Sequence, residues 1–82
     1  MVRAYVLIGV TAGKALEVVH KLQGQEGILQ ADAITGEYDV IARAEADDVA
    51  GIGKLIVEKI QAADGVFKTI TCIVVQLSLI HI

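Results

Sequence analysis

A glycine followed closely by an aspartate marks the stretch of this sequence with the clearest capacity to bind a small polar ligand. Gly36 lacks the Cβ that restricts other residues, so its amide can turn toward a ligand, and Asp39 follows at the start of an apolar strand. Thr69 and Thr71 add two hydroxyl groups in the last predicted strand. Amides and hydroxyls can bind an α-carboxylate, and an aspartate can accept from an α-ammonium. This set of groups therefore suits a zwitterion.

Each of these residues also has a purely structural interpretation. Gly36 can supply a turn with positive φ, and Asp39 can accept from nearby backbone amides. The threonines are common strand residues that could simply face a partner sheet. Tyr38 belongs to the same hairpin, but strand alternation points its side chain into the core. Both interpretations stay open at the level of the sequence.

Other patterns that commonly carry chemistry are incomplete. His20 and His81 have no metal-ligand spacing between them, so two solvent-exposed histidines are expected. Residues 51–53, Gly-Ile-Gly, lack the Lys-Ser/Thr of a phosphate loop, and the acids at 47–48 most simply cap a helix. No serine, cysteine and histidine set suggests a nucleophile. We therefore expect no metal, no cofactor and no enzymatic activity.

Length and composition indicate one small domain that assembles with other copies. With 82 residues, the chain is near the lower size at which a single core is self-sufficient. Hydrophobic residues make up 55% of it, more than a small monomer can bury, yet no run approaches the roughly 18 apolar residues of a membrane span. A net charge of -3 without a basic stripe argues against direct nucleic-acid binding. Because no targeting segment precedes the first strand, we expect a cytoplasmic protein.

Hydrophobic periodicity predicts two similar halves, each built as strand, helix and strand. Strands are expected at residues 3–10, 28–34, 38–45 and 66–77, and amphipathic helices at 15–22 and from Asp47 or Asp48 to about residue 60. Two such units joined by the hairpin at Gly36 give an α+β, ferredoxin-like βαββαβ fold. We expect a four-stranded antiparallel sheet in the order 4-1-3-2, with both helices on one face.

The face of this sheet away from the helices is predicted to be apolar and open. Strand alternation places four hydrophobic residues on it: Ile41, Ile73, Val75 and Leu77. A second sheet is therefore expected to pack there, forming a dimer. The same alternation places Asp39, Thr69 and Thr71 on this open face, where they could share a ligand.

Two glycines interrupt the second predicted helix. Gly51 and Gly53 should each weaken it by roughly 1 kcal/mol relative to alanine. Such a cost suggests that another chain or a ligand approaches the helix closely at these positions.

Four stretches of the sequence resemble the effector-binding (RAM) domain of the Lrp/AsnC transcriptional regulators. They are the opening residues 1–8, the helix start at 12–14, the hairpin Gly36-Glu37-Tyr38-Asp39-Val40-Ile41 and the strand residues 69–71. The resemblance covers about residues 2–77, and its most specific element is the Gly-x-Tyr-Asp hairpin. We expect an effector-binding domain at residues 1–77. The tail at 78–82 does not match the family, and its role is left unassigned.

The resemblance implies a non-enzymatic domain that binds amino acids or related metabolites between dimers, within an octamer or another assembly of dimers. Gly36, Tyr38, Asp39, Thr69 and Thr71 match positions where the family gathers its ligand. Full-length relatives place a helix-turn-helix before this domain, whereas this sequence starts at the first strand. Autonomous DNA binding is therefore not expected, and the domain would act either alone or by co-assembling with a DNA-binding relative.

Two other functions stay open as alternatives. One is a small enzyme of the dimeric α/β-barrel kind, because related sheets host cofactor-independent oxygenases. The predicted open face offers no cluster of His, Trp or Asn for such chemistry. The other is a purely structural assembly module without a ligand.

Overall fold

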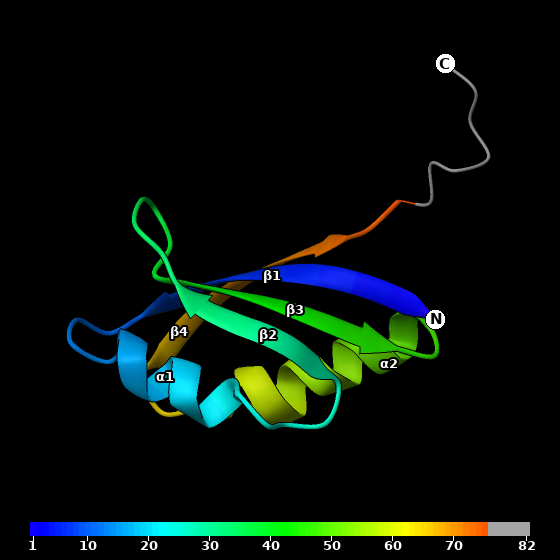
Figure 1. Ribbon diagram of the computed structural model, residues 1–82, viewed down its shortest axis with the longest axis horizontal. Helices are drawn as coiled ribbons and strands as arrows, with labels where there is room; N and C mark the ends of the chain where they lie inside the picture. The colour runs from blue at the N-terminus through cyan, green and yellow to red at the C-terminus, as the bar shows by residue number, and fades with distance from the viewer. Residues whose placement is uncertain (76–82) are drawn as a thin grey trace, which may run out of the picture.

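The computed structural model describes residues 1–75, which form two helices and four strands. In chain order the elements are β1 (Val2–Val10), α1 (Ala15–Leu22), β2 (Ile28–Ala33), β3 (Val40–Ala46), α2 (Val49–Leu55), the π-helical segment η1 (Ile56–Ile60) and β4 (Val66–Ile73). The segment η1 continues directly from α2, so the two together make one helical element (Figure 1). The predicted tail and the boundary at residue 77 lie outside the described residues.

All strand pairs are antiparallel, and the sheet has the order β2-β3-β1-β4. Counted from the other edge, this is the predicted order 4-1-3-2. Both helices lie against one face of the sheet (Figure 1). The α+β, ferredoxin-like βαββαβ fold is therefore confirmed for the described residues.

Helix α1 forms where the apolar stripe was predicted. Val18, Val19 and Leu22 are buried, as expected for side chains three and four residues apart on one helix face. The backbone becomes extended at Gln23, and Gly24 follows with a φ of 86°. A glycine in this left-handed conformation is a common way to end a helix, because it avoids the Cβ clash.

The second helix begins at a side-chain cap, and its two glycines have different surroundings. Asp48 Oδ1 accepts a hydrogen bond from the Gly51 amide at 2.7 Å. A Cβ added to Gly51 would lie 3.0 Å from the Ala46 Cβ and 3.1 Å from Asp48 Oδ1, whereas one added to Gly53 would meet nothing within 4 Å. The close approach expected at Gly51 is thus made by residues of the same chain.

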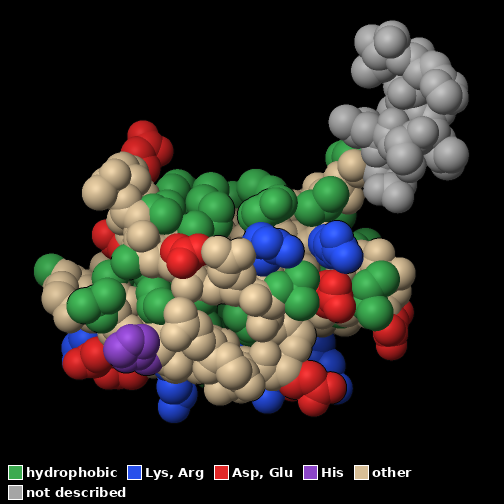
Figure 2. All heavy atoms as spheres, viewed as in Figure 1, with side chains coloured by type: hydrophobic (Ala, Val, Ile, Leu, Met, Phe, Trp, Pro, Cys, Tyr) green, Lys and Arg blue, Asp and Glu red, His purple; other side chains and the backbone are tan. Residues whose placement is uncertain are grey.

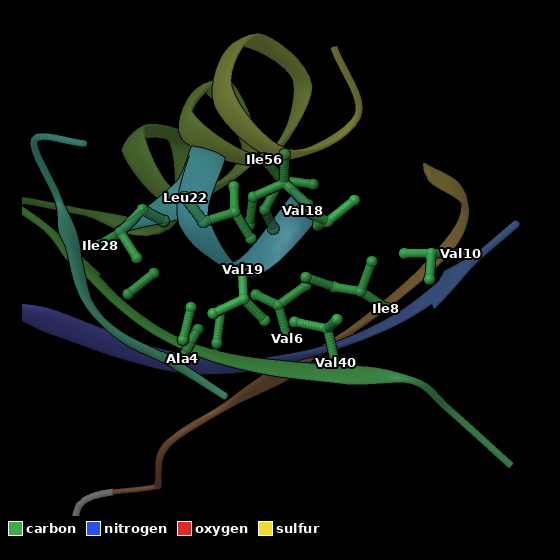
Figure 3. Packing of buried hydrophobic residues seen from close by; sticks show 14 of the residues in the cluster. Ala4, Val6, Ile8, Val10, Val18, Val19, Leu22, Ile28, Val40 and Ile56 are labelled. Atoms are coloured by element: carbon green, nitrogen blue, oxygen red, sulfur yellow. The ribbon is translucent and has the colours of Figure 1, made fainter. Parts of the chain in front are cut away.

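One hydrophobic core fills the space between the helices and the sheet. Figure 3 shows side chains of α1 and of the second helical element directed toward those of β1 and β3. Burying a Val, Leu or Ile side chain stabilises a fold by about 1.5–3 kcal/mol. The largest fully buried side chains are Ile8, Leu22, Ile52, Ile60, Val6, Val18 and Val40.

The face of the sheet opposite the helices, called here the open face, is largely apolar. Figure 2 shows hydrophobic side chains gathered along the side of the molecule away from the helices. The register assigns to this face Tyr5, Leu7, Ile41, Ile70 and Cys72. Ile41 is where the sequence predicted it.

The predicted faces of the last strand are wrong. Ile73 pairs with Ala4, which is buried on the helix side, so Ile73 lies on that side and Ile70 and Cys72 lie on the open face. Because β4 is an edge strand with residues exposed on both faces, its hydrophobic pattern does not distinguish them. The strand also ends at Ile73, before Val75, and Leu77 lies outside the described residues.

Candidate functional site

The hairpin loop between β2 and β3, residues 34–39, projects from the sheet on the side opposite the helices (Figure 1). Gly36 lies in this loop with a φ of 116°, and a Cβ added to it would meet nothing within 4 Å. Glycine is thus favoured here by the backbone conformation and not by a close neighbour. The residue is exposed, as a loop residue that contacts a ligand or a second chain must be.

Asp39 joins this loop to the end of the central strand. Its Oδ2 accepts a hydrogen bond from the Val10 amide at 2.9 Å, and its own amide donates to the Ile8 carbonyl at 3.0 Å. The Asp39 carbonyl accepts from the Ile34 amide at 2.9 Å, which closes the loop. Asp39 thus accepts from a backbone amide, as its structural interpretation has it, but the donor is 29 positions away and not local, and one carboxylate oxygen is used by the fold itself.

Tyr38 packs against a lysine instead of entering the core. It is half-buried, and Lys68 Nζ lies 5.5 Å from the centroid of its ring. That distance permits a cation–π interaction. The prediction that Tyr38 points into the core is wrong. The strand β3 begins only at Val40, so strand alternation does not extend back to Tyr38.

The two threonines lie on the other face of the sheet from the one predicted. Thr69 pairs with Ile8 and Thr71 with Val6, and both partners are buried beneath the helices. Thr69 Oγ1 also accepts a hydrogen bond from Gln61 Nε2 at 3.1 Å. Within one chain, therefore, Thr69 and Thr71 lie on the helix side of the sheet and not on the open face.

The sequence argument missed Lys68, which lies beside Tyr38 of the hairpin, and Phe67, which precedes it. Lys68 pairs with Gly9, while the next register pair joins Val66 to Val10, so Phe67 is the extra residue of a β-bulge. Phe67 is 70% exposed, and its Cζ lies 3.2 Å from the position of a Cβ added to Gly9. Two features of the sequence could have indicated these residues. A phenylalanine and a lysine directly precede Thr69, and the neighbouring strand contains Gly9.

Among the hollows on the described surface, two of the larger ones lie away from the hairpin tip. One of about 680 Å³ is bordered by Glu45, Asp47, Asp48 and Glu58 together with Lys54, near the start of α2. The other, of about 360 Å³, lies beside β4 and is lined by Gln61, Val66, Phe67, Lys68 and Thr69. Thr69 is the one predicted site residue that lines either hollow.

Residues 1–75 carry neither a cluster of metal ligands nor a membrane-spanning helix. This part of the chain contains no group of three or more His, Cys, Asp or Glu side chains that could hold a metal ion. Neither helical element in these residues has the length and hydrophobicity that a membrane span requires.

The sequence matches one protein-family model over nearly its whole length. Residues 3–78 match the model described as the Lrp/AsnC ligand binding domain. The chain belongs to this family. The predicted resemblance is confirmed. The residues that match the family model are those that form the ferredoxin-like fold described above.

One regulator sequence and one solved structure are similar to this chain to different extents. The uncharacterized HTH-type transcriptional regulator PF0250 of Pyrococcus furiosus is 27% identical over 73 residues, which are 85% of this chain and 49% of the regulator. This chain thus spans about half the length of that curated relative. The crystal structure of FFRP-DM1 is 35% identical with a TM-score of 0.85, covering 92% of this chain and 100% of the other.

The same fold occurs in a more distant regulator. The transcriptional regulator NMB0573 of Neisseria meningitidis, solved as a complex with L-Met, is 20% identical with a TM-score of 0.80. The match covers 98% of this chain and 53% of the regulator. At this identity the similarity establishes a shared fold.

Proposed function

We propose that this protein is a non-enzymatic effector-binding module that binds a small amino acid and forms an assembly of dimers. The observation that carries the proposal is the family match, which extends over residues 3–78 and so includes all elements of the described fold except the first residue of β1. The proposal includes a cytoplasmic location for the protein. The protein influences transcription by co-assembling with a DNA-binding Lrp/AsnC relative.

An amino acid is favoured as the ligand for two reasons. The regulator NMB0573, which shares this fold, was solved with L-Met. The hairpin also offers both kinds of group that a zwitterion needs, an exposed backbone at Gly36 and the second carboxylate oxygen of Asp39. We assign Gly36, Tyr38 and Asp39 to one wall of the site.

The other wall comes from a neighbouring subunit. Thr69 and Thr71 lie on the helix side of β4, so they do not face the hairpin of their own chain. In the proposed assembly the hairpin of one dimer lies against the β4 edge of another, where Thr69 and Thr71 complete the site. An effector bound there stabilises the contact between dimers, and an octamer is the favoured closed form.

The dimer itself forms through the open face. Ile70 is 38% exposed and Tyr5 44% exposed on this face, although both lie in the middle of strands. A sheet face of this kind is normally covered by protein, and a two-fold dimer covers it with the same surface from a second copy.

A thermal-shift screen of the amino acids tests the proposed function. A ligand present at about 100 times its Kd stabilises the native state by about 2.7 kcal/mol. For a domain of this size, that corresponds to a rise in Tm of about 10 °C or more. We expect a subset of amino acids to produce such a rise in the wild type. The variant Thr71→Val keeps the side-chain volume but removes the hydroxyl, and it should lose most of the rise.

Other outcomes would select the alternatives. If no amino acid raises the Tm while light scattering shows an intact assembly, the protein is a structural assembly module. Turnover of an added compound, followed by mass spectrometry, would instead favour a dimeric α/β-barrel enzyme.

A further inference from the structure

Lys68 occupies a special position at the hairpin end of the open face. It pairs with Gly9, which has no side chain to cover it, and its ammonium lies over the Tyr38 ring. The backbone beside Tyr38 is anchored, because Asp39 is hydrogen-bonded through its backbone and side chain to β1. The cation is therefore held next to the proposed effector site by elements that belong to the fold.

No carboxylate within residues 1–75 forms an ion pair with Lys68. Within residues 1–75, the ion pairs join Arg3 to Glu45 and Lys14 to both Glu17 and Asp64, and none involves Lys68. The face of an aromatic ring orients a cation without satisfying its hydrogen-bond donors. Among the described residues, none accepts a hydrogen bond from the Lys68 ammonium, so it can donate to a ligand.

The other polar groups predicted to bind the ligand are less available. One oxygen of Asp39 binds the Val10 amide, and Asp39 would repel an anion in any case. Thr69 and Thr71 lie on the other face of the sheet in this subunit, and the pair that a neighbouring subunit contributes to the proposed site offers neutral hydroxyl donors. Lys68 is the cationic side chain paired with the Tyr38 ring of the hairpin, and an ammonium binds a carboxylate more strongly than a neutral donor does.

We propose that Lys68 binds the carboxylate of the effector, and that Tyr38 is a positioning residue that orients the ammonium. The inference rests on the proposed function, since it assigns a role within the same site. Phe67, exposed directly beside Lys68, gives the ligand an apolar surface. The ligand class that fits is a carboxylate carrying an apolar group.

Paired acids and amides test this assignment directly, because the two members of a pair differ only in the group that Lys68 would bind. The probes are isovalerate and isovaleramide, together with any amino acid that binds in the thermal-shift screen and its carboxamide. Binding to the intact assembly is measured by calorimetry and by the NMR signals of the lysine side chains. In the wild type we expect the acid to bind about tenfold more tightly than the amide, because a charge-assisted hydrogen bond is lost in the amide.

The variants assign that preference to individual residues. Lys68→Gln should reduce the acid-to-amide ratio to about one, whereas Lys21→Gln, on the exposed side of α1, should keep the wild-type ratio. Tyr38→Leu should lower the ratio and Tyr38→Phe should restore it, because phenylalanine keeps the ring face. Phe67→Ala should reduce the preference for isovalerate over acetate.

The outcomes separate the inference from the proposed function. Amino acids that bind Lys68→Gln with the wild-type acid preference would overturn the role of Lys68 and leave the effector function intact. If no amino acid binds but isovalerate shifts the Lys68 signal selectively, the carboxylate site stands and the amino-acid function fails. A wild type in which isovalerate leaves the Lys68 signal unchanged overturns the inference directly.

Discussion

Asp39 shows how one side chain can serve both the fold and a ligand site. Its Oδ2 accepts from the Val10 amide, so the hairpin is attached to the end of the central strand β1. This contact spans 29 positions in the sequence, and the sequence alone gives no reason to choose Val10 as the donor. Substituting Asp39 is therefore expected to affect folding as well as effector response.

Substitution of Asp39 should lower stability to an extent that depends on the replacement. Asp39→Ala leaves the part-buried Val10 amide without its acceptor, which costs about 1–3 kcal/mol. Asp39→Asn keeps an acceptor oxygen and should cost less than half as much. Urea denaturation of the two variants measures the difference. Equal stabilities for Asp39→Ala and the wild type would mean that the Val10 contact contributes nothing to the fold.

At the scale of elements, the sequence predicted the helices and most strands well because their periodicity is set by burial on one side. Val18, Val19 and Leu22 of α1 are buried as the 3.6-residue pattern indicated. The faces of β4 could not be predicted in this way. Neither of its faces is fully covered, and its orientation follows from its register with β1.

The candidate site was predictable only in part for the same reason. Gly36 and Asp39 were found because a turn and a strand start are local features. The meeting of Tyr38 with Lys68 depends on a loop conformation and on a bulge in another strand. A bulge shifts every later residue of its strand relative to simple alternation, so it cannot be located from a pattern of apolar and polar residues.

The two glycines of α2 should respond in opposite ways to alanine. Gly53→Ala should stabilise the chain by about 0.5–1 kcal/mol, because alanine loses less backbone entropy and the site is open. Gly51→Ala should be destabilising, since its methyl group would crowd Ala46 and the Asp48 cap. Thermal unfolding at a fixed protein concentration provides the measurement. If Gly53→Ala reduces the mass of the assembly, α2 contacts another copy there.

At the scale of the whole molecule, the proposal that two copies dimerise through the open face can be tested by a substitution on that face. Ile70→Glu would place a charge in the proposed dimer contact and should weaken dimerisation by about tenfold or more. Leu16→Glu, at a position on α1 that is 66% exposed, is the matched control and should leave the dimer intact. Sedimentation equilibrium distinguishes the two. An unchanged dimer in Ile70→Glu would show that the copies associate through another surface.

The strand order has one more consequence, which concerns how the two halves of the chain depend on each other. Of the three strand pairs in the sheet, β2 with β3, β3 with β1, and β1 with β4, each joins a strand before Gly36 to a strand after it. A fragment of residues 1–36 or 37–82 therefore has no neighbouring strands of its own. Each fragment should be unfolded by circular dichroism when alone, and the mixture should regain the native spectrum. Cleavage at the hairpin tip would therefore turn folding into a bimolecular association of two fragments. If each fragment were fused to a different protein, recovery of the fold would report that the two proteins are close together.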